Sequence, residues 1–525
     1  MNVPRTPFQP VPMLFIVPPV GSEFHGFLLE AHRVVVREPQ ILLAIDADLD
    51  RHGLTKKAVR VEDERWREAR SLDLPTLGWR PGPIAPESLR LEAGRPRTPA
   101  YVVYLFLVGR GYYGGYRTGE AMTLMQESMT LQVLLTNQGM TLPGFTTLNE
   151  LANAVSNPTR ERVLDAQLRA VLDEDFDDFS KMLLDSTAVA GNTCWPTESC
   201  LMKDLVGRLW RLGGKLEQMG LPRFAATQVS KVLGTLSALH REISMGYEGP
   251  RKGKARARRR LYRKMLVKAR RAQTLLAPEV ARTRQALAIL DTEPSRRARA
   301  ERVVAWLESD LVDLARVIAS CEARIVRGEQ VPAKDKVMSV SDPDARMIVK
   351  GGREPVVGYK PQLARSGSGF ITGLIVPIGN AADSSQLVPM FDQVVSHTGK
   401  VPDLVSGDDG YASARGRKIL LKRGVKVVSI SGSKGKRLTP DDEWNREDYA
   451  TARDDRSAVE SLMFCLKDGF DFGNLARRGV ECVRAEMLER VLAYNFCRLA
   501  VARWAVRDRP LAGIDPTLRD EAEVA

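Results

Sequence analysis

The residues best suited to chemistry in this chain are three carboxylates, Asp185, Asp408 and Glu460. Asp185 and Asp408 each end an apolar segment, and Glu460 lies one turn into a helical pattern. Mg²⁺ prefers oxygen ligands and needs only one or two protein carboxylates per ion, because it keeps several waters. Two such ions roughly 3.5–4 Å apart serve phosphodiester cleavage, one acting on the attacking oxygen and one on the leaving oxygen. These residue types therefore indicate metal-assisted phosphoryl chemistry, provided that the fold brings them together.

The three positions lie far apart in the sequence, so only a folded domain can converge them. Hydrophobic periodicity and turn residues predict the elements around them. The first is a strand at 179–190, and a hairpin follows with strands at 356–364 and 369–377 that turns at Arg365–Ser368. Next come a helix at 384–398 capped by Asp383 and a strand ending at Asp408. The last are a helix at 412–423, a strand at 425–430 and, after a polar stretch, helices from 456 to 504. This is the order of an RNase H-like α/β fold, in which functional groups gather at strand ends.

The helix that carries Glu460 has two interpretations. Arg456, Glu460 and Lys467 have the spacing of one helix face, which suits a metal ligand flanked by two cations beside a DNA backbone. The alternative is an exposed Arg456–Glu460 ion pair worth a few tenths of a kcal/mol, about 0.2–0.5. Spacing alone favours the ion pair.

Composition narrows the class of partner. The 525 residues carry 78 Lys and Arg against 65 Asp and Glu, a net charge of +13, which favours a polyanion. The six cysteines form no CxxC pair and only five histidines are present, which argues against a zinc site and fits a reducing cytosol. The apolar run Met13–Val17 is too short for a signal sequence and no segment reaches transmembrane length. We therefore expect a soluble cytoplasmic protein of two to four domains with no membrane contact.

A strongly basic run lies within a region, 197–331, that is predicted to be almost wholly helical, with breaks near 220–222, 249–250 and Pro278. Twelve of the twenty-one residues from 251 to 271 are Lys or Arg, without one carboxylate. Such charges repel one another, so DNA phosphate is favoured over a merely solvated face as their counter-charge. The residues singled out are Arg256, Arg258, Arg259, Arg260, Arg263 and Lys264.

The N-terminal third is less informative. Apolar runs at 14–17, 34–36 and 41–45 predict a few strands or short helices, and Pro75–Pro99 is typical of a linker. Residues 100–172 are predicted to be helical, with a helix-turn-helix pattern in which Thr147 and Glu150 form a capping box. A DNA-reading helix-turn-helix and an ordinary helical hairpin both fit.

Three blocks of sequence resemble those of the DDE-type insertion-sequence transposases. The first is LLDSTAVAGNTCWPTESCLMKDL, which contains Asp185. The second runs from SDPDARM (341–347) through GYKPQLA to VPDLVSGDDGYAS; the family's aspartate sits two positions before Gly-Tyr, which selects Asp408 and leaves Asp409 as the alternative ligand. The third, RSAVESLMFCLKDGFDFGNLARRG, is similar to an R-x-x-x-E-x6-K block with Glu460 as the third carboxylate. The likeness spans roughly Asp178 to Ala500, with weaker similarity from about Arg95.

The resemblance implies a DNA transposase with Asp185, Asp408 and Glu460 as catalytic metal ligands for two Mg²⁺ or Mn²⁺ ions. It implies binding to double-stranded DNA at terminal inverted repeats, hydrolysis that frees a 3′-hydroxyl, and attack of that hydroxyl on target DNA. It also implies a homodimer or higher oligomer on DNA, in a prokaryotic cytoplasm beside the nucleoid. Two alternatives are an RNase H-like nuclease without strand transfer and a non-catalytic DNA-binding derivative.

The expected fold is an RNase H-like α/β core, a mixed sheet flanked by helices, interrupted by a large helical insertion and preceded by a mainly helical DNA-binding region. About 150 residues separate the first-aspartate strand from the hairpin, which is tolerable because the entropy of loop closure grows only logarithmically with length. The expected boundaries are 1–95, 96–175 (helical), 176–196 plus 337–505 (catalytic), 197–336 (insertion, with the basic run) and 506–525 (tail).

Overall fold

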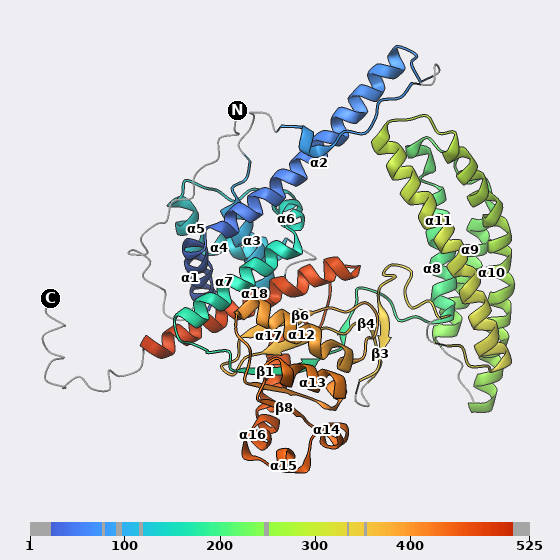
Figure 1. The fold of residues 1–525 in the computed structure, drawn as a ribbon. Helices are drawn as coiled ribbons and strands as arrows, with labels where there is room; N and C mark the ends of the chain where they lie inside the picture. Colours follow the sequence, from blue (N-terminus) through green and yellow to red (C-terminus); the bar gives the residue numbers. More distant parts are fainter. Residues whose placement is uncertain are drawn as a thin grey trace, which may run out of the picture.

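The structure is a computed structural model that describes residues 23–75, 79–90, 97–114, 119–245, 251–332, 335–350 and 354–507. Figure 1 shows N-terminal helices packed beside a long C-terminal helix, an α/β sheet next to them, and a group of long helices set to one side. None of the helices in the described ranges has the length and apolar content needed to cross a membrane.

The main sheet has five strands in the order β6-β5-β1-β7-β8. Its strands are β1 (Lys181–Ser186), β5 (Gln362–Arg365), β6 (Ile371–Ile375), β7 (Leu404–Gly407) and β8 (Val427–Ile430). The central strand β1 pairs antiparallel with β5 and parallel with β7, while β5 and β6 form an antiparallel hairpin and β8 runs parallel to β7. The predicted hairpin turn and the predicted strands before Asp408 and after residue 425 are confirmed.

Helices cover both faces of this sheet, because its strands alternate apolar side chains from one face to the other. In β1, Leu183 belongs to one apolar core, whereas Met182 and Leu184 belong to another. The first core lies under the last two helices and the second under the two helices that flank β7. These helices are α12 (Asp383–Thr398), α13 (Ala414–Lys422), α17 (Ser457–Gly469) and α18 (Val480–Arg507), and α14 (Ser433–Leu438), α15 (Asp441–Trp444) and α16 (Glu447–Asp455) fill the stretch after β8. The expected mixed sheet flanked by helices is confirmed.

A second, three-stranded antiparallel sheet stands beside the first. Its strands are β2 (Val189–Ala190), β4 (Val356–Tyr359) and β3 (Arg346–Ile348), in the order β2-β4-β3. The prediction of one strand over 356–364 is therefore wrong: the chain changes sheet at Lys360–Pro361, where proline cannot donate to a ladder.

The N-terminal region is helical and shares its core with α17, α18 and one face of the main sheet. Its helices are α1 (Glu23–Arg37), α2 (Gln40–Ser71), α3 (Ala100–Tyr113), α4 (Glu120–Glu127), α5 (Met129–Thr136), α6 (Phe145–Ala154) and α7 (Asn157–Asp173), with a 3-10 turn at Pro86–Ser88. The apolar runs at 34–36 and 41–45 are helical and form no strands; the run at 14–17 lies outside the described residues. The predicted capping box is also wrong, because the N-cap of α6 is Gly144, three residues before Thr147, and Thr147 lies inside the helix.

Four long helices form what we call the helical arm, which has its own apolar core. They are α8 (Glu198–Gly213), α9 (Gln228–Met245), α10 (Arg251–Ala288) and α11 (Pro294–Cys321), with short turns at Leu216–Met219 and Glu322–Arg327. The break predicted at Pro278 is wrong: the proline lies inside α10, with buried neighbours at Leu276 and Val280 holding the helix on its core. The apolar residues of α11, from Val303 to Cys321, lie in this core.

The helical arm touches the N-terminal region through the far end of α2. The Asp63 carboxylate accepts hydrogen bonds from the Ser295 amide (3.0 Å) and hydroxyl (2.5 Å), at the first turn of α11. Asp63 of α2 thus accepts a hydrogen bond from one of the backbone amides that have no partner within the first turn of α11. Figure 1 shows α2 extending toward the helical arm.

Candidate active site at the ends of β1 and β7

Asp185 lies near the end of β1 and is mostly buried, with 12% of its side chain exposed. Asp185 lies two residues after Leu183 in the strand, so both side chains point to the same face of the sheet. This is the face that α17 and α18 cover. Lys350 Nζ donates to Asp185 Oδ1 at 2.8 Å and also to the carbonyl and hydroxyl oxygens of Ser186. A cation therefore already compensates this carboxylate.

Asp408 follows β7 directly and lies next to Asp185. The parallel register pairs Leu183 with Ser406, and two further residues along each strand bring Asp185 level with Asp408. Burial raises the pKa of Asp408, and the nearby negative charges of Asp185 and Asp383 raise it further, while Lys350 lowers it. The two carboxylates thus lie close enough for the charge of one to shift the pKa of the other, as is expected of two ligands of one cation.

Asp409, the neighbour of Asp408, points elsewhere. Its Oδ1 accepts hydrogen bonds from the amides of Lys434 (2.7 Å) and Gly435 (3.1 Å), so it caps the first turn of α14. Gly432 permits this approach: it has a φ of +96°, and an added Cβ would lie 2.7 Å from the Asp409 carboxylate. The alternative ligand is therefore engaged in holding a helix.

Another buried aspartate, Asp383, lies beside the half-buried Asp408. Its carboxylate accepts from Gln362 Nε2 at 2.8 Å and pairs with Lys360 Nζ at 2.8 Å. A Cβ added to Gly410 would lie 2.8 Å from Asp383 and 2.9 Å from Asp408, so both carboxylates approach that glycine. The predicted role of Asp383 as a helix cap is wrong, because α12 begins at Asp383 itself with Ala382 before it.

Glu460 lies on α17, which packs against β1 through Val459, Leu462, Met463 and Leu466. The Glu460 side chain is 63% exposed, and it pairs with Arg456 at 3.2 Å. Lys467, further along α17, donates to the carbonyl of Ala188 at 3.2 Å, just past the end of β1. The structure brings Asp185 and Asp408 together, whereas Glu460 is turned toward solvent and forms no three-carboxylate group with them in the part of the chain that the structure describes.

The donor chemistry of the Asp185–Asp408 pair fits a hard divalent cation, since one or two carboxylates with waters and substrate phosphates suffice for Mg²⁺. Among the described residues there is no group of three or more His, Cys, Asp or Glu placed to hold a metal ion. Lys350 supplies one positive charge beside the pair, through its ion pair with Asp185.

Residues 335–496 match the family model of the transposase DDE domain. Over these residues the chain is similar to a transposase DDE domain, and we refer to this segment as the DDE domain. The resemblance seen in the sequence is thereby confirmed. The matched segment, residues 335–496, contains Asp408 and Glu460. Asp185 lies on β1, which precedes this segment in the sequence. No curated protein and no solved structure matches the chain.

The aspartates of the SDPDARM segment (341–347) form hydrogen bonds that stabilise the fold of the DDE domain. Asp342 is fully buried and accepts from the Tyr359 hydroxyl at 2.7 Å and from the Gly479 amide at 3.2 Å. Asp344 accepts from the Val480 amide at 3.0 Å. These aspartates tie β4 to the start of α18.

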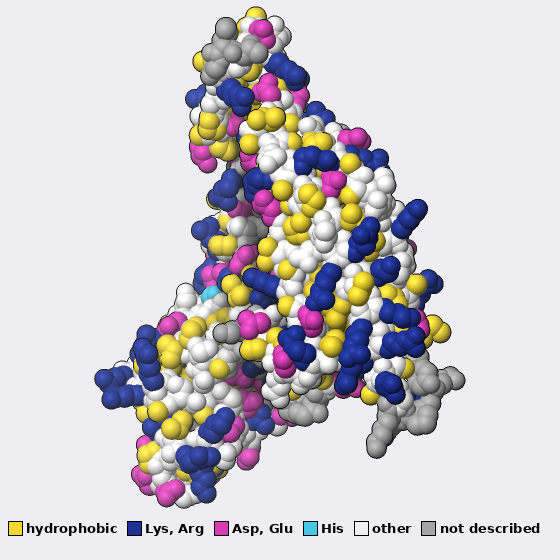
Figure 2. Space-filling view, turned by 90° about the vertical axis from the view of Figure 1, so that its right-hand side faces the viewer, with side chains coloured by type: hydrophobic (Ala, Val, Ile, Leu, Met, Phe, Trp, Pro, Cys, Tyr) yellow, Lys and Arg dark blue, Asp and Glu magenta, His cyan; other side chains and the backbone are white. Residues whose placement is uncertain are grey.

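The basic run lies on the first half of α10, away from the DDE domain (Figure 1). Arg256, Arg258, Arg259, Arg260, Arg263 and Lys264 are all exposed, and the structure pairs none of these six with a carboxylate within the described part of the chain. Figure 2 looks onto the helical arm and shows Lys and Arg side chains gathered on its lower part.

Three polar residues around the aspartate pair escaped prediction: Lys350, Lys360 and Gln362. Lys350 lies in an irregular segment between β3 and β4, where no periodicity marks it. Gln362, fully buried, was detectable as a polar residue inside an apolar strand, since such groups need an internal partner. It finds partners in Asp383 and in the Tyr411 hydroxyl, which donates to it.

Proposed function

We propose that this chain is a DDE transposase, which binds the inverted repeats at transposon ends, hydrolyses a phosphodiester bond to free a 3′-hydroxyl, and joins that hydroxyl to target DNA. The observation that carries the proposal is the side-by-side placement of Asp185 and Asp408. One of these aspartates lies within the DDE domain and the other on a strand supplied from outside it. A helical DNA-binding module without chemistry has no use for two adjacent carboxylates, one buried and one half-buried.

An RNase H-like core is part of this proposal. The strand order β6-β5-β1-β7-β8, with an antiparallel hairpin on one side of β1 and parallel strands on the other, supports it. We propose that residues 176–196 and 337–505 make up this core and that 197–336 are inserted into it. The separate apolar core of the helical arm supports that division. Residues 1–95 and 96–175 would precede the core and 506–525 would follow it.

In the proposed site, Asp185 and Asp408 hold divalent ions, Mg²⁺ or Mn²⁺ and two per site, with Glu460 as third ligand. When bound, such ions activate the attacking oxygen and stabilise the leaving 3′-oxygen. Gln362 and Lys360 fix Asp383 behind the pair. Lys350 would release Asp185 as the metal takes over the positive charge that it supplies.

The course of α17 supports Glu460 as the third ligand. Lys181, at the start of β1, pairs with Asp455 at 2.6 Å, and Lys467 bonds to Ala188 beyond the end of β1. These two anchors make α17 run alongside β1, with Glu460 between them and on the face of the sheet toward which Asp185 points. In the proposal the Glu460 side chain turns from Arg456 to the aspartates when metal and DNA are bound.

Double-stranded DNA is the proposed partner, at both transposon ends and target, with a homodimer or higher oligomer assembled on it in the cytoplasm. Arg456 and Lys467 lie beside the site and would contact the phosphates of the cut strand. The unpaired cations Arg256 to Lys264 on α10 would contact flanking DNA, because phosphates are the counter-charge they lack.

The experiment is to compare three neighbouring substitutions in the full chain: Asp185→Asn, Asp408→Asn and Asp409→Asn. The first two should lower the cutting of end-bearing DNA by at least about a thousandfold while DNA binding persists, because a neutral amide binds a divalent cation more weakly than a carboxylate and does not balance its charge. Asp409→Asn should retain cutting, because an asparagine caps a helix nearly as well. Unchanged cutting by Asp185→Asn would overturn the assignment.

Joining must be measured separately. With pre-cleaved ends and Mn²⁺, a transposase should link the 3′-end to a target plasmid, and an RNase H-like nuclease would join nothing. A derivative that only binds DNA would neither cut nor join.

A further inference from the structure

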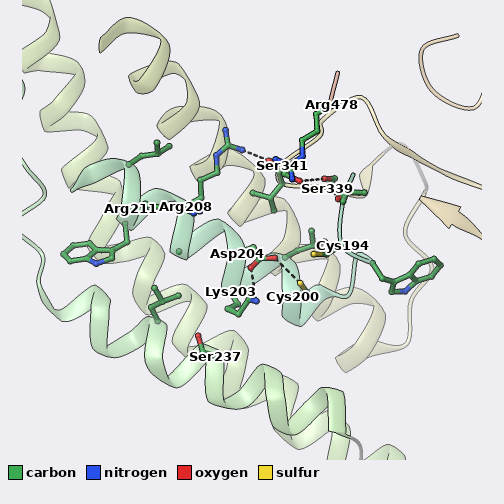
Figure 3. A pocket seen from close by; sticks show the side chains of 18 of the residues that line it. Cys194, Cys200, Lys203, Asp204, Arg208, Arg211, Ser237, Ser339, Ser341 and Arg478 are labelled. Carbon is green, nitrogen blue, oxygen red and sulfur yellow. Dashed lines mark hydrogen bonds and ion pairs between the residues drawn. The ribbon is translucent and has the colours of Figure 1, made fainter. Parts of the chain in front are cut away.

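A cavity of about 980 Å³ lies where the helical arm meets the α/β part of the molecule. Its wall comes from the loop Thr193–Trp195, from α8 and α9 of the arm, from the segment 339–341 and from Arg478 before α18. Figure 3 shows these side chains converging from both parts of the protein. Thr193 follows Asp185 by eight residues in the sequence.

The wall of this cavity carries uncompensated positive charge. Its cations are Lys203, Arg208, Arg211, Lys215 and Arg478, and its one carboxylate is Asp204. Lys203 pairs with Asp204 at 3.0 Å, and Arg208 pairs with Asp310 at 3.2 Å, which cancels two of the cations.

The other three cations, Arg211, Lys215 and Arg478, have no carboxylate partner in the ranges that the structure covers. Arg478 donates to a backbone oxygen, that of Asn192, at 2.9 Å. Each of the three is exposed at the cavity. Three unpaired cations around one hollow make it a site for an anion with several charges.

The remaining wall suits the phosphates and bases of one DNA strand. Hydroxyls from Thr193, Ser237, Ser339 and Ser341 line it, and these donate readily to phosphate oxygens. Trp195 stands at the cavity with 52% of its surface exposed, which offers a face on which a base can stack. Cations along a groove with an aromatic side chain between them are the arrangement by which proteins hold single strands.

We propose that this cavity binds a short stretch of a single DNA strand, with its phosphates on Arg211, Lys215 and Arg478 and a base against Trp195. The inference rests on the proposed function, in which a strand separates from its complement at the cut. The site is distinct from the basic run, whose residues on α10 do not line the cavity.

The location is tested by protection of a cysteine. Cys194 lines the cavity and is exposed, and Cys482 on α18 is exposed elsewhere, so one protein contains both probe and control. Alkylation is followed at each cysteine by peptide mass spectrometry, with Asp185→Asn protein and no divalent ion, so that nothing is cut. An oligothymidylate should slow alkylation of Cys194 at least about threefold and leave Cys482 unchanged.

The charges are tested by two matched double variants. Arg211→Gln with Lys215→Gln removes two cations of the cavity, and Lys231→Gln with Arg241→Gln removes two exposed cations of α9 that do not line it. The first should weaken oligothymidylate binding about tenfold and reduce the salt slope of log K by about 1.4, since each single-strand phosphate that is neutralised contributes about 0.7. The second should change neither.

Three outcomes would overturn the proposal. They are equal protection of Cys194 and Cys482, equal weakening of binding in the two double variants, and protection of Cys194 by inorganic pyrophosphate as strong as that by the oligonucleotide. The last would assign the cavity to a small phosphate ligand. None of these results depends on cutting, so the proposed transposase function is judged separately, by the Asp185 and Asp408 variants.

Discussion

Neighbouring carboxylates in this molecule have different environments, and the differences lie in single interactions. Asp408 shares its surroundings with Asp185 and with the cation of Lys350, whereas Asp409 accepts two amides of α14. Burial and the charge of Asp185 both act to raise the pKa of Asp408 above its ordinary value. Lys350 opposes that rise in the pKa of Asp408.

Replacing Lys350 with Met should raise the pKa of Asp408 further, because the nearest positive charge is removed. Protons would then compete with cations for the pair at higher pH, so the pH at which Mn²⁺ binding is half lost should move upward. Calorimetric titration with Mn²⁺ across a range of pH measures this.

Lys426→Met is the control, since Lys426 is 72% exposed and pairs with Asp403 on the surface. A midpoint that moves equally in both variants, or downward in Lys350→Met, would show that Lys350 does not act on Asp408.

At the scale of elements, α10 carries charge on one side and core on the other. Tyr262, Met265, Leu266, Ala269 and Ala272 pack into the core of the helical arm, and the arginines between them face outward. The helix can therefore lose its arginines without losing its packing, so its contribution to DNA binding can be measured without unfolding the arm.

Replacing Arg258, Arg259 and Arg260 with Gln should weaken binding to duplex DNA and reduce the salt slope by roughly 2.7, about 0.9 for each phosphate that the variant no longer neutralises. Fluorescence anisotropy at several salt concentrations gives the slope, and thermal unfolding should be unchanged. Three exposed arginines away from this stretch, Arg223, Arg299 and Arg302, supply the matched triple variant. A slope equal in the two triple variants would assign the basic run to a solvated surface.

The sequence predicts much of the fold at this scale, because strands and helices with one apolar face show a clear period. Four of the five strands of the main sheet (β1, β6, β7 and β8) and the helices α12, α13, α17 and α18 followed from such patterns, although β4 and β5 were predicted as one strand over 356–364. The second sheet did not, since β2 and β3 are two and three residues long and leave no period to detect. In the candidate site, Asp185 and Asp408 could be predicted from the sequence because each lies at the end of a predicted strand. Lys350 was not, because its place beside Asp185 depends on how an irregular segment is folded back.

At the scale of the whole molecule, α18 joins the DDE domain to the N-terminal helices. Glu489 of α18 is fully buried and accepts hydrogen bonds from Arg110 of α3 and Arg160 of α7, with Arg477 3.9 Å away. Burial alone would raise the pKa of Glu489, but the three arginines overcome it and lower the pKa to about 2. A largely buried charge cluster thus holds three segments together.

Glu489→Gln should lower the free energy of unfolding by about 3–5 kcal/mol, because it leaves buried arginines without their counter-charge. The folded pKa lies below the ordinary value near 4.5, so the stabilisation by Glu489 is complete above that pH and is lost as the pH falls toward about 2. Denaturant unfolding between pH 3 and 7 should show this loss in the native chain and a flatter profile in the variant. Equal pH profiles would contradict the linkage.

The position of β1 has a consequence for how the protein is made. Lys181 of β1 pairs with Leu404 of β7, the parallel neighbour of the central strand. The ribosome must therefore add about 220 residues after β1 before β7 exists, which takes roughly 10 to 45 s at ordinary rates of synthesis. During that time the helical arm can complete its own core, while the apolar residues Met182, Leu183 and Leu184 remain without a sheet to cover them. A chain released before residue 404 would expose this strand as a template for aggregation. Prematurely ended copies of the protein should therefore be recovered with chaperones or in aggregates, and full-length copies should not.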